Sequence, residues 1–238
     1  MSFIGNPELS IIVPAFKEAP NIPILVKEIS SALESFISEW ELIIVDDNSR
    51  DGTADACDRL KKQGLPLKLV VRKSERGLAT AVIQGFAQAQ ASIFVVMDAD
   101  LSHNPDTIPL FCRAIRDGSE FVLGSRYIPG GGTDDKWTVF RYLNSKIATL
   151  LARPLVSISD PMSGFFAFPR SLWERCHDLS PVGYKIALEI LVKCKPQHLK
   201  EVPIHFRTRK LGRSKLSVKQ QILYLLHLWR LYKYKYFL

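Results

Sequence analysis

The chain has 238 residues, enough to bury a large core, and this length favours one main domain with at most a short appendage. No apolar run reaches the roughly 18 to 20 residues that a membrane-spanning helix needs, and the N-terminus lacks the pattern of a secretion signal, so we expect the chain to stay in the cytosol. The net charge of +8 belongs to the tail, because residues 205–238 carry nine Lys and Arg and no acid.

The first half of the chain alternates between predicted strands and predicted helices. Short apolar, β-branched runs indicate strands covered on both faces at residues 9–13, 42–45, 67–71, 93–97 and 121–123. Helical patterns lie between them at residues 22–37, 53–63, where Thr53 is a candidate N-cap, and 78–90. This alternation predicts an α/β fold with a mostly parallel sheet and helices on both faces.

The rhythm changes after Tyr127. We expect a Gly-rich loop, and then the elements that complete the acceptor side of a cleft: a helix at 136–152, a strand at 164–168, a helix at 184–194 and a strand at 199–207. A polar loop follows, and Ser217 is a candidate cap for a last helix that reaches about residue 234. The predicted organisation is therefore a catalytic domain at residues 1–216 and a basic amphipathic helix at residues 217–238.

Apolar and basic residues alternate around this last helix. Its apolar side would carry Val218, Ile222, Leu225, Leu226, Trp229 and Tyr232, with Lys and Arg elsewhere. Such a helix suits the interface of an anionic bilayer, and it fits lipid better than nucleic acid, which we do not expect as a partner. The alternative is a helix that docks on its own domain or on a sister subunit.

The four cysteines are scattered singly along the sequence. None has the close Cys or His spacing of a zinc site or a redox pair, so we interpret all four as packing residues: Cys57, Cys112, Cys176 and Cys194.

Ligands of open α/β sheets bind at the carboxyl ends of the strands, so polar residues that follow the apolar runs are candidate site residues. Asp98 and Asp100 follow the run at 93–97, and two aspartates one residue apart can hold a divalent cation that bridges substrate phosphates. The chain has no Gly-rich phosphate loop, which leaves the diphosphate to such an ion. A solvated turn is the alternative for this triplet, as it is for Asp47 and Glu18, which would otherwise bind a nucleobase and ribose.

Several motifs in this order resemble the family 2 glycosyltransferases, and most closely the branch of dolichyl or polyprenyl phosphate mannose synthases. They are I-V-P-A-F-K-E, V-D-D-N-S-R-D-G-T, G-L-A-T-A, M-D-A-D-L-S-H-N-P, G-S-R-Y, D-P-M-S-G-F-F and G-R-S-K-L. The resemblance implies a GT-A (Rossmann-like) fold, a sugar nucleotide donor, first of all GDP-mannose, and a polyprenyl or dolichyl phosphate acceptor.

The resemblance also implies roles for individual residues. The donor nucleotide would be bound by Pro14, Phe16, Glu18, Val45, Asp47, Asp98, Ala99 and Asp100. Asp98 and Asp100 would hold Mg or Mn, and with Arg126 they would form the catalytic group. The phosphates of donor and acceptor would be bound by Arg126, Arg141, Arg209 and Lys215.

The chain departs from the family pattern in three places. Lys17 stands where many relatives have Asn, Phe16 often alternates with Tyr, and Ser102 replaces a Gln metal ligand of some members, which puts a metal contact at residue 102 in doubt. The Q-x-x-R-W signature of processive polysaccharide synthases is missing, which argues against a chain-building enzyme.

The expected reaction needs no general base. A phosphate monoester has a second pKa of about 6, so the acceptor is largely a dianion at neutral pH and is itself a sufficient nucleophile. We therefore expect His103 to shape the turn after Asp100. A single displacement would invert the anomeric configuration, and the enzyme would be peripheral on the cytoplasmic face of a membrane.

Other functions remain open on the sequence alone. The donor can be UDP-glucose or a UDP-amino sugar, and a separate membrane-anchored partner subunit can be required. Two more distant alternatives are a sugar nucleotidyltransferase and an inactive membrane-recruitment module, although the presence of both Asp98 and Asp100 beside Arg126 disfavours the latter.

Overall fold

The structure is a computed structural model, and it describes residues 7–134, 139–180, 182–208 and 218–237. The strands are β1 (Leu9–Ala15), β2 (Trp40–Asp46), β3 (Leu67–Val71), β4 (Ile93–Val96), β5 (Phe121–Ser125), β6 (Gly132–Thr133), β7 (Phe166–Pro169), β8 (Leu199–Pro203) and β9 (His205–Phe206). The helices are α1 (Ile22–Leu33), α2 (Thr53–Lys62), α3 (Leu78–Gln88), the 3₁₀ turn η1 (Pro105–Thr107), α4 (Ile108–Arg116), α5 (Val139–Ala152), α6 (Arg170–Arg175), α7 (Ile186–Cys194) and α8 (Val218–Phe237).

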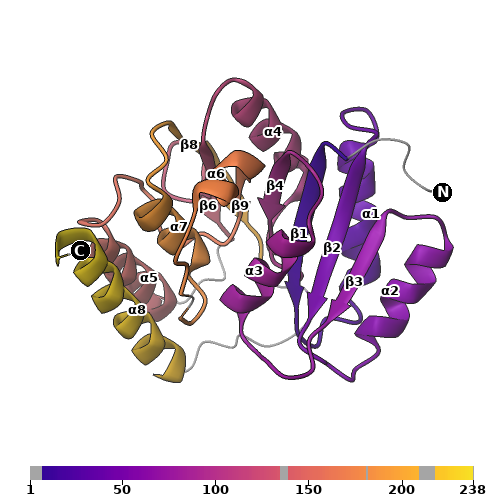
Figure 1. Cartoon of the computed structure of the whole chain (residues 1–238), viewed down its shortest axis with the longest axis horizontal. Helices are drawn as coiled ribbons and strands as arrows, with labels where there is room; N and C mark the ends of the chain where they lie inside the picture. The colour runs from indigo at the N-terminus through magenta and orange to yellow at the C-terminus, as the bar shows by residue number, and fades with distance from the viewer. Residues whose placement is uncertain (1–6, 135–138, 181, 209–217, 238) are drawn as a thin grey trace.

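Seven strands form one sheet in the order β3-β2-β1-β4-β7-β5-β8 (Figure 1). All neighbours in it are parallel except β7, which runs antiparallel between β4 and β5. Strands β6 and β9 form a separate two-stranded sheet, in which Gly132 pairs with His205. The expected mostly parallel sheet is confirmed, and the one reversed strand is the predicted segment at 164–168, displaced by one to two residues.

Alternate residues of the strands enter two hydrophobic cores, as the period of two in a strand requires. In β1, Ile11 and Val13 face the core covered by α1, α2 and α4, whereas Ile12 faces the core covered by α3, α6, α7 and α8. The sheet is therefore buried on both faces, which explains why the strands read as continuous apolar runs rather than as alternating ones.

Helix α3 lies unusually close to the sheet. At Gly85, an added Cβ would collide with the side chain of Ile12 in β1, so only glycine permits this approach. The N-terminal end of α3 lies at the carboxyl end of β2, where the amide of Gly77 donates a hydrogen bond of 2.9 Å to Asp47.

Some elements differ from the sequence expectations. Helices α4 and α6 were not anticipated, and the strand expected at 199–207 is divided into β8 and β9. Thr53 is not the N-cap of α2: Gly52, with φ of 97°, occupies that position, and the Asp51 carboxylate accepts hydrogen bonds from the amide (3.1 Å) and hydroxyl (2.6 Å) of Thr53. The candidate cap Ser217 lies outside the described residues.

The last helix packs on its own chain through one side. Tyr224 donates a hydrogen bond to the carbonyl of Ala148 in α5 (2.7 Å), Tyr232 donates one to the carbonyl of Leu151 (2.8 Å), and Leu231 is buried in the second core. The alternative of a docked helix is therefore correct for this side of α8.

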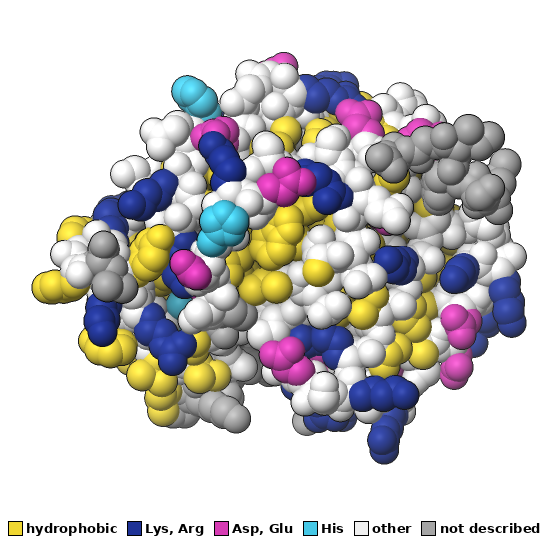
Figure 2. Space-filling view, viewed as in Figure 1, with side chains coloured by type: hydrophobic (Ala, Val, Ile, Leu, Met, Phe, Trp, Pro, Cys, Tyr) yellow, Lys and Arg dark blue, Asp and Glu magenta, His cyan; other side chains and the backbone are white. Residues whose placement is uncertain are grey.

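The opposite side of α8, together with α5, exposes apolar residues. We call this surface the α5–α8 apolar face; its members are Leu143, Ile147, Leu150 and Leu151 of α5 and Ile222, Leu225, Leu226 and Trp229 of α8. Trp229 is 63% exposed. Hydrophobic side chains gather beside Lys and Arg at this end of the molecule (Figure 2). Within the described part of the chain, no helix is both long and apolar enough to cross a membrane.

Candidate active site

A cavity of about 470 Å³ opens at the carboxyl ends of β1, β2, β4 and β5. It collects eight residues that the sequence had put forward from widely separated motifs: Pro14, Phe16, Glu18, Asp47, Asp98, Ala99, Asp100 and Arg126. At the end away from Phe16, the lining comes from α5, the start of α8 and the segment before α7. The cavity therefore joins the predicted nucleotide end to the two helices of the α5–α8 apolar face.

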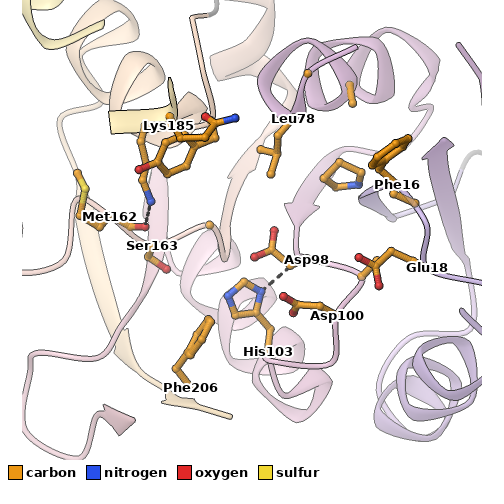
Figure 3. Close-up of a pocket in the computed structure, with 18 of the residues that line it drawn as sticks. Phe16, Glu18, Leu78, Asp98, Asp100, His103, Met162, Ser163, Lys185 and Phe206 are labelled. Atoms are coloured by element: carbon orange, nitrogen blue, oxygen red, sulfur yellow. Dashed lines mark hydrogen bonds between the residues drawn. The ribbon is translucent and has the colours of Figure 1, made fainter. Parts of the chain in front are cut away.

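Phe16 and Glu18 stand at one end of this cavity, with Asp98 and Asp100 between them and Lys185 (Figure 3). The Arg76 guanidinium lies 5.3 Å from the centre of the Phe16 ring. Glu18 accepts a hydrogen bond of 2.6 Å from the side chain of Asn21. Between Phe16 and Glu18, Lys17 has φ of 60°, a left-handed backbone conformation that Asn adopts more readily than Lys. Lys17, which stands where many relatives have Asn, is therefore a strained substitution.

Asp47 is held by a buried ion pair. Its carboxylate accepts hydrogen bonds from Nε of Arg72 at 2.7 Å and from the amide of Gly77 at 2.9 Å. Arg72 also donates to Thr80 Oγ1 and to the carbonyl of Gly77, and so ties the end of β3 to the first turn of α3. Sequence reasoning missed Arg72, although it directly follows the apolar run of β3 and was therefore detectable by the same rule.

Asp98 and Asp100 lie on the turn after β4. Ser102 donates two hydrogen bonds to Oδ1 of Asp100, from its hydroxyl at 2.5 Å and from its amide at 3.1 Å. Leu101, between Asp100 and Ser102, is buried with φ of 63°, so the turn holds a strained backbone conformation. Both aspartate carboxylates point toward the cavity (Figure 3). Ser102 is thus a residue that orients Asp100.

His103 closes the same turn. Its Nδ1 accepts a hydrogen bond of 3.2 Å from the amide of Asp98, and its ring stacks on Phe165 with centres 4.9 Å apart. Burial lowers the pKa of His103 to about 4, so the ring is neutral at physiological pH. The expectation that His103 shapes the turn is confirmed.

The two aspartates fit a divalent cation by their chemistry. Carboxylate oxygens are the ligands that Mg²⁺ prefers, and Mg²⁺ sites commonly use one or two carboxylates together with substrate phosphates and water. Within the described residues there is no group of three or more His, Cys, Asp or Glu that could bind a metal by itself. A metal at Asp98 and Asp100 would therefore need further ligands from outside this group of side chains.

Arg126 is fixed by Asp160. Two parallel hydrogen bonds, from Nε and Nη2, reach the two carboxylate oxygens at 2.7 Å each, and the amide of Arg126 donates a third at 3.0 Å. Burial alone would lower the pKa of Arg126, but the hydrogen bonds and charge of Asp160 outweigh it and raise that pKa. The sequence contained Asp160 in the motif D-P-M-S-G-F-F, but gave it no role because the pairing spans 34 residues.

Lys185 faces the cavity from the residue before α7. Its ammonium group donates a hydrogen bond to the carbonyl of Met162 (Figure 3) and lies 4.6 Å from the centre of the Tyr184 ring. Burial and the nearby Arg126 charge together lower the pKa of Lys185 to about 8, against the opposing effects of Asp160 and Asp98. Sequence reasoning missed this cation because no strand end or motif marks it.

One expected site residue does not line the cavity, and three have side chains that lie outside the described part of the chain. Val45 is fully buried in the core that α3, α6, α7 and α8 cover. Arg141 belongs to α5, but its side chain lies outside the description, as do Arg209 and Lys215 entirely. The roles of these four residues stay predictions.

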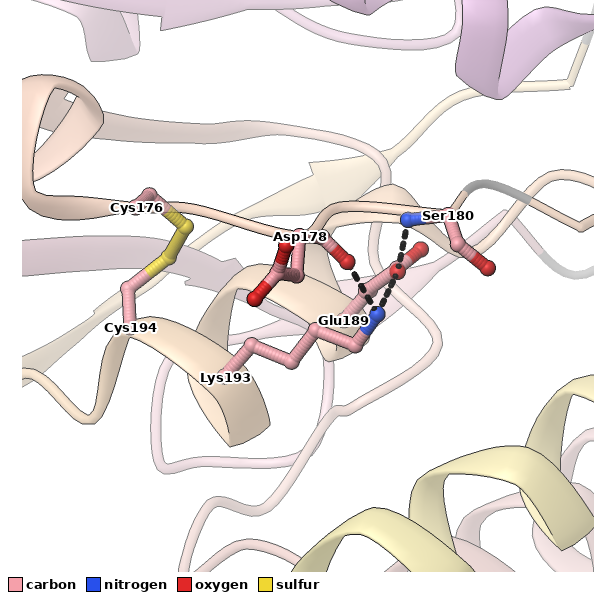
Figure 4. Close-up of a disulfide and its surroundings, with 6 residues drawn as sticks. All are labelled: Cys176, Asp178, Ser180, Glu189, Lys193 and Cys194. Atoms are coloured by element: carbon pink, nitrogen blue, oxygen red, sulfur yellow. Dashed lines mark hydrogen bonds and ion pairs between the residues drawn. A yellow bond between two sulfur atoms is a disulfide. The ribbon is translucent and has the colours of Figure 1, made fainter.

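A disulfide constrains the segment that carries Lys185. Cys176, at the end of α6, and Cys194, at the end of α7, form a disulfide with their Cα atoms 5.0 Å apart (Figure 4). Interpreting these two cysteines as packing residues was wrong, because two helix ends 18 residues apart in sequence meet in space. Cys57 and Cys112 are buried as expected, and burial raises the pKa of each thiol to about 12.

A buried carboxylate lies between the same two cysteines in sequence. Oε1 of Glu189 accepts hydrogen bonds from the amide of Ser180 and from Nζ of Lys193, both at 2.7 Å, and His227 of α8 lies 3.5 Å from Oε2. Burial alone would raise the pKa of Glu189, but His227, Lys193 and Ser180 together outweigh it and lower that pKa. Glu189 therefore links α7, the segment before it and α8.

The chain resembles known proteins over nearly its whole length. The model of the family described as glycosyl transferase family 2 matches residues 10–176. A dolichol-phosphate mannosyltransferase of Mycosarcoma maydis is 42% identical over 98% of this chain and 81% of its own length. One of Saccharomyces cerevisiae is 43% identical over 96% and 88%, and one of Pyrococcus furiosus is 40% identical over 96% and 64%.

Solved structures are similar in fold at much lower identity. The glucosyl-3-phosphoglycerate synthase of Mycobacterium tuberculosis, solved in complex with Mn²⁺, uridine diphosphate and glucosyl-3-phosphoglycerate, superposes with a TM-score of 0.68 at 19% identity, over 96% of this chain and 80% of that one. This likeness confirms the expected GT-A fold. The family match across residues 10–176, with relatives at 40–43% identity, shows that the chain belongs to glycosyl transferase family 2.

Proposed function

We propose that this chain transfers mannose from GDP-mannose to the phosphate of a dolichyl or polyprenyl phosphate, with inversion at the anomeric carbon. The observation that carries the proposal is the path of the cavity. It runs from Phe16 and Glu18, past Asp98 and Asp100, to the helices that bear the α5–α8 apolar face. The identity of 40–43% to dolichol-phosphate mannosyltransferases supports mannose as the sugar and dolichyl phosphate as the acceptor.

The nucleotide would occupy the end formed by β1 and β2. The Phe16 ring offers an aromatic face to the base, and Glu18 and Asp47 offer carboxylates to ribose and base, with Asp47 oriented by Arg72. The diphosphate would then lie over Asp98 and Asp100. A Mg or Mn ion bound there would neutralise the charge that develops on the departing nucleoside diphosphate.

The chemistry asks little acid-base work of the protein. An oxygen of the acceptor phosphate attacks the anomeric carbon, the bond from that carbon to the donor phosphate breaks, and the nucleoside diphosphate leaves with the electron pair. The acceptor dianion carries no proton that must be removed, and His103 is neutral with its Nδ1 already bonded to the Asp98 amide. The protein supplies position and charge: Asp160 holds Arg126 at the reacting centre, and Arg126 stabilises the phosphates there.

The lipid substrate would arrive along the α5–α8 apolar face. In a bilayer, this face would bury its leucines and Trp229 among acyl chains while the basic residues of α8 meet anionic headgroups. This arrangement supports a peripheral enzyme on the cytoplasmic face of the membrane. A separate membrane-anchored subunit would compete for the same face, and flotation of the purified chain with anionic liposomes tests whether the chain binds lipid alone.

A transfer assay tests the proposed function. The protein is incubated with polyprenyl phosphate and radiolabelled GDP-mannose, UDP-glucose or a UDP-amino sugar, with Mg²⁺ or with excess chelator, and lipid is extracted. We expect label in the lipid phase when the donor is GDP-mannose and Mg²⁺ is present, and none with the UDP-sugars or with excess chelator. Lipid labelling from a UDP-sugar in place of GDP-mannose would refute the donor, and release of pyrophosphate from a nucleoside triphosphate would indicate a nucleotidyltransferase instead.

A further inference from the structure

The cations that line the described part of the cavity are unequally engaged. The Nε and Nη2 edge of the Arg126 guanidinium donates to both carboxylate oxygens of Asp160, so its charge is largely compensated. Arg76 stands at the other end, over the Phe16 ring. Lys185 lies at the end near α5 and α8, and within the described residues no carboxylate oxygen comes within 4.0 Å of its Nζ.

The position of Lys185 is well defined by its surroundings. Its Nζ is anchored by the Met162 carbonyl and beside the Tyr184 ring, and the disulfide between Cys176 and Cys194 brackets the segment that carries it. An ammonium group has three N–H donors, and the Met162 carbonyl occupies one of them. The remaining donors are available to a ligand in the cavity, toward which the side chain projects (Figure 3).

An ammonium group without a carboxylate partner is costly to bury, and the lowered pKa of Lys185 expresses that cost. An anionic ligand at this position would recover it. The neighbouring lining residues Asn144 and Ser145 of α5 and Gln220 of α8 are neutral, so a phosphate there would meet hydrogen-bonding groups and no opposing carboxylate on those helices. The donor diphosphate would lie on the other side, where Asp98 and Asp100 would hold a divalent cation against it.

From this placement we propose that Lys185 binds the phosphate of the lipid acceptor, by a charge-assisted hydrogen bond from Nζ to an oxygen that does not attack the sugar. The inference rests on the proposed function and assigns the acceptor end of the same cavity. Lys185 would bring the uncompensated positive charge to the acceptor, while Arg126, held by Asp160, serves the phosphates nearer the reacting carbon.

Substitutions at Lys185 separate its charge from its hydrogen bond. Lys185→Gln keeps a donor for the Met162 carbonyl but removes the charge, Lys185→Met removes both, and Lys185→Arg keeps the charge. Lys200→Met, on the exposed part of β8, is the matched control. For each protein we would measure KM for dolichyl phosphate, KM for GDP-mannose, kcat and Tm.

We expect Lys185→Gln and Lys185→Met to raise KM for dolichyl phosphate by about 10-fold or more, the effect of one charge-assisted hydrogen bond. KM for GDP-mannose should stay within about 2-fold, Lys185→Arg should recover most of the loss, and the control should match the wild type. An unchanged acceptor KM in Lys185→Gln would overturn the proposal, and so would a parallel rise in KM for the donor.

A binding measurement keeps this inference apart from the proposed function. Titration calorimetry with farnesyl phosphate, farnesol, inorganic phosphate and GDP does not depend on turnover. We expect Lys185→Gln to weaken farnesyl phosphate binding by about 10-fold while GDP binding is unchanged. If the wild type transfers no mannose but shows this difference, the proposed function fails and the acceptor site stands; equal binding of farnesyl phosphate by both proteins overturns the site. If Lys185→Gln weakens the binding of inorganic phosphate but not that of farnesyl phosphate, Lys185 belongs to a site for free anions, which also contradicts the proposal.

Discussion

Neutralising Asp160 tests how the reacting end of the cavity is built. In the native structure Asp160 is fully buried, and it accepts the Nε and Nη2 hydrogen bonds of Arg126 at 2.7 Å each, while the Arg126 side chain is 8% exposed. Asp160→Asn keeps the size of the side chain and one acceptor oxygen. It leaves a buried guanidinium without its counter-charge, and it no longer fixes the orientation of Arg126.

The expected cost follows from those contacts. A hydrogen bond to a charged group contributes about 1.5–3 kcal/mol, and removing one partner of a buried ion pair costs about 3–5 kcal/mol. Since Asn retains one acceptor, we expect the free energy of unfolding to fall by about 3 kcal/mol. The double variant Asp160→Asn with Arg126→Met removes the unpaired charge as well, and should therefore be more stable than Asp160→Asn alone by about 1 kcal/mol or more.

Urea unfolding followed by tryptophan fluorescence measures both values, since the chain has four Trp. Mannose transfer measured in parallel should fall strongly in the single variant and remain low in the double variant, because stability returns without Arg126. An unfolding free energy for Asp160→Asn within about 0.5 kcal/mol of the wild type would show that the ion pair with Arg126 does not stabilise the fold. A double variant that loses the sum of both single effects would show that the two side chains are not coupled.

Three further predictions concern the frame around the site. Replacing both Cys176 and Cys194 by Ser should lower the free energy of unfolding by about 3 kcal/mol, because the disulfide links residues 18 apart; a reductant should destabilise the wild type equally and leave the double variant unchanged in chemical unfolding. Lys17→Asn should raise the free energy of unfolding by up to about 1 kcal/mol, because φ at this position is 60°, and a lower Tm would contradict the assigned backbone strain. Glu189→Gln should destabilise the protein at pH 7, because the lowered pKa of Glu189 means that its carboxylate stabilises the fold above the ordinary pKa of 4.5. This contribution is lost as the pH falls through the folded pKa, so the difference in unfolding free energy between variant and wild type should vanish in acid. A difference that does not depend on pH would argue against a stabilising charge at Glu189.

Local patterns were sufficient for most of the sheet. The apolar runs located β1 to β5 because a strand buried on both faces needs no long-range information to be recognised. The reversal of β7 between β4 and β5 was not predictable in this way, since strand order depends on pairings between distant segments. Helix α4 was within reach, because Ile108, Phe111 and Cys112 have helical spacing after the Asn104 cap of the preceding turn, and all three are buried.

The same division holds for the site. Carboxylates that follow strands, such as Asp98 and Asp100, were predictable because the carboxyl edge of a parallel sheet gathers them. Two residues on the other side of the cavity were not predictable: Asp160 reaches Arg126 across 34 residues, and Lys185 comes from a segment before α7 that carries no motif. The places of Asp160 and Lys185 depend on the packing of distant elements, which no local pattern encodes.

In the proposed reaction, the turn after β4 supports the departure of the nucleoside diphosphate during transfer of the sugar to a lipid phosphate. The most direct test of this role compares wild type with Asp100→Asn in the transfer of radiolabelled mannose from GDP-mannose to dolichyl phosphate, with Tm measured on the same samples. We expect label in the lipid extract of the wild type, and a turnover lower by about 100-fold or more in the variant at nearly unchanged Tm, since Asn can still accept the Ser102 hydrogen bonds. Wild-type turnover in Asp100→Asn would show that the Asp100 carboxylate has no part in the transfer.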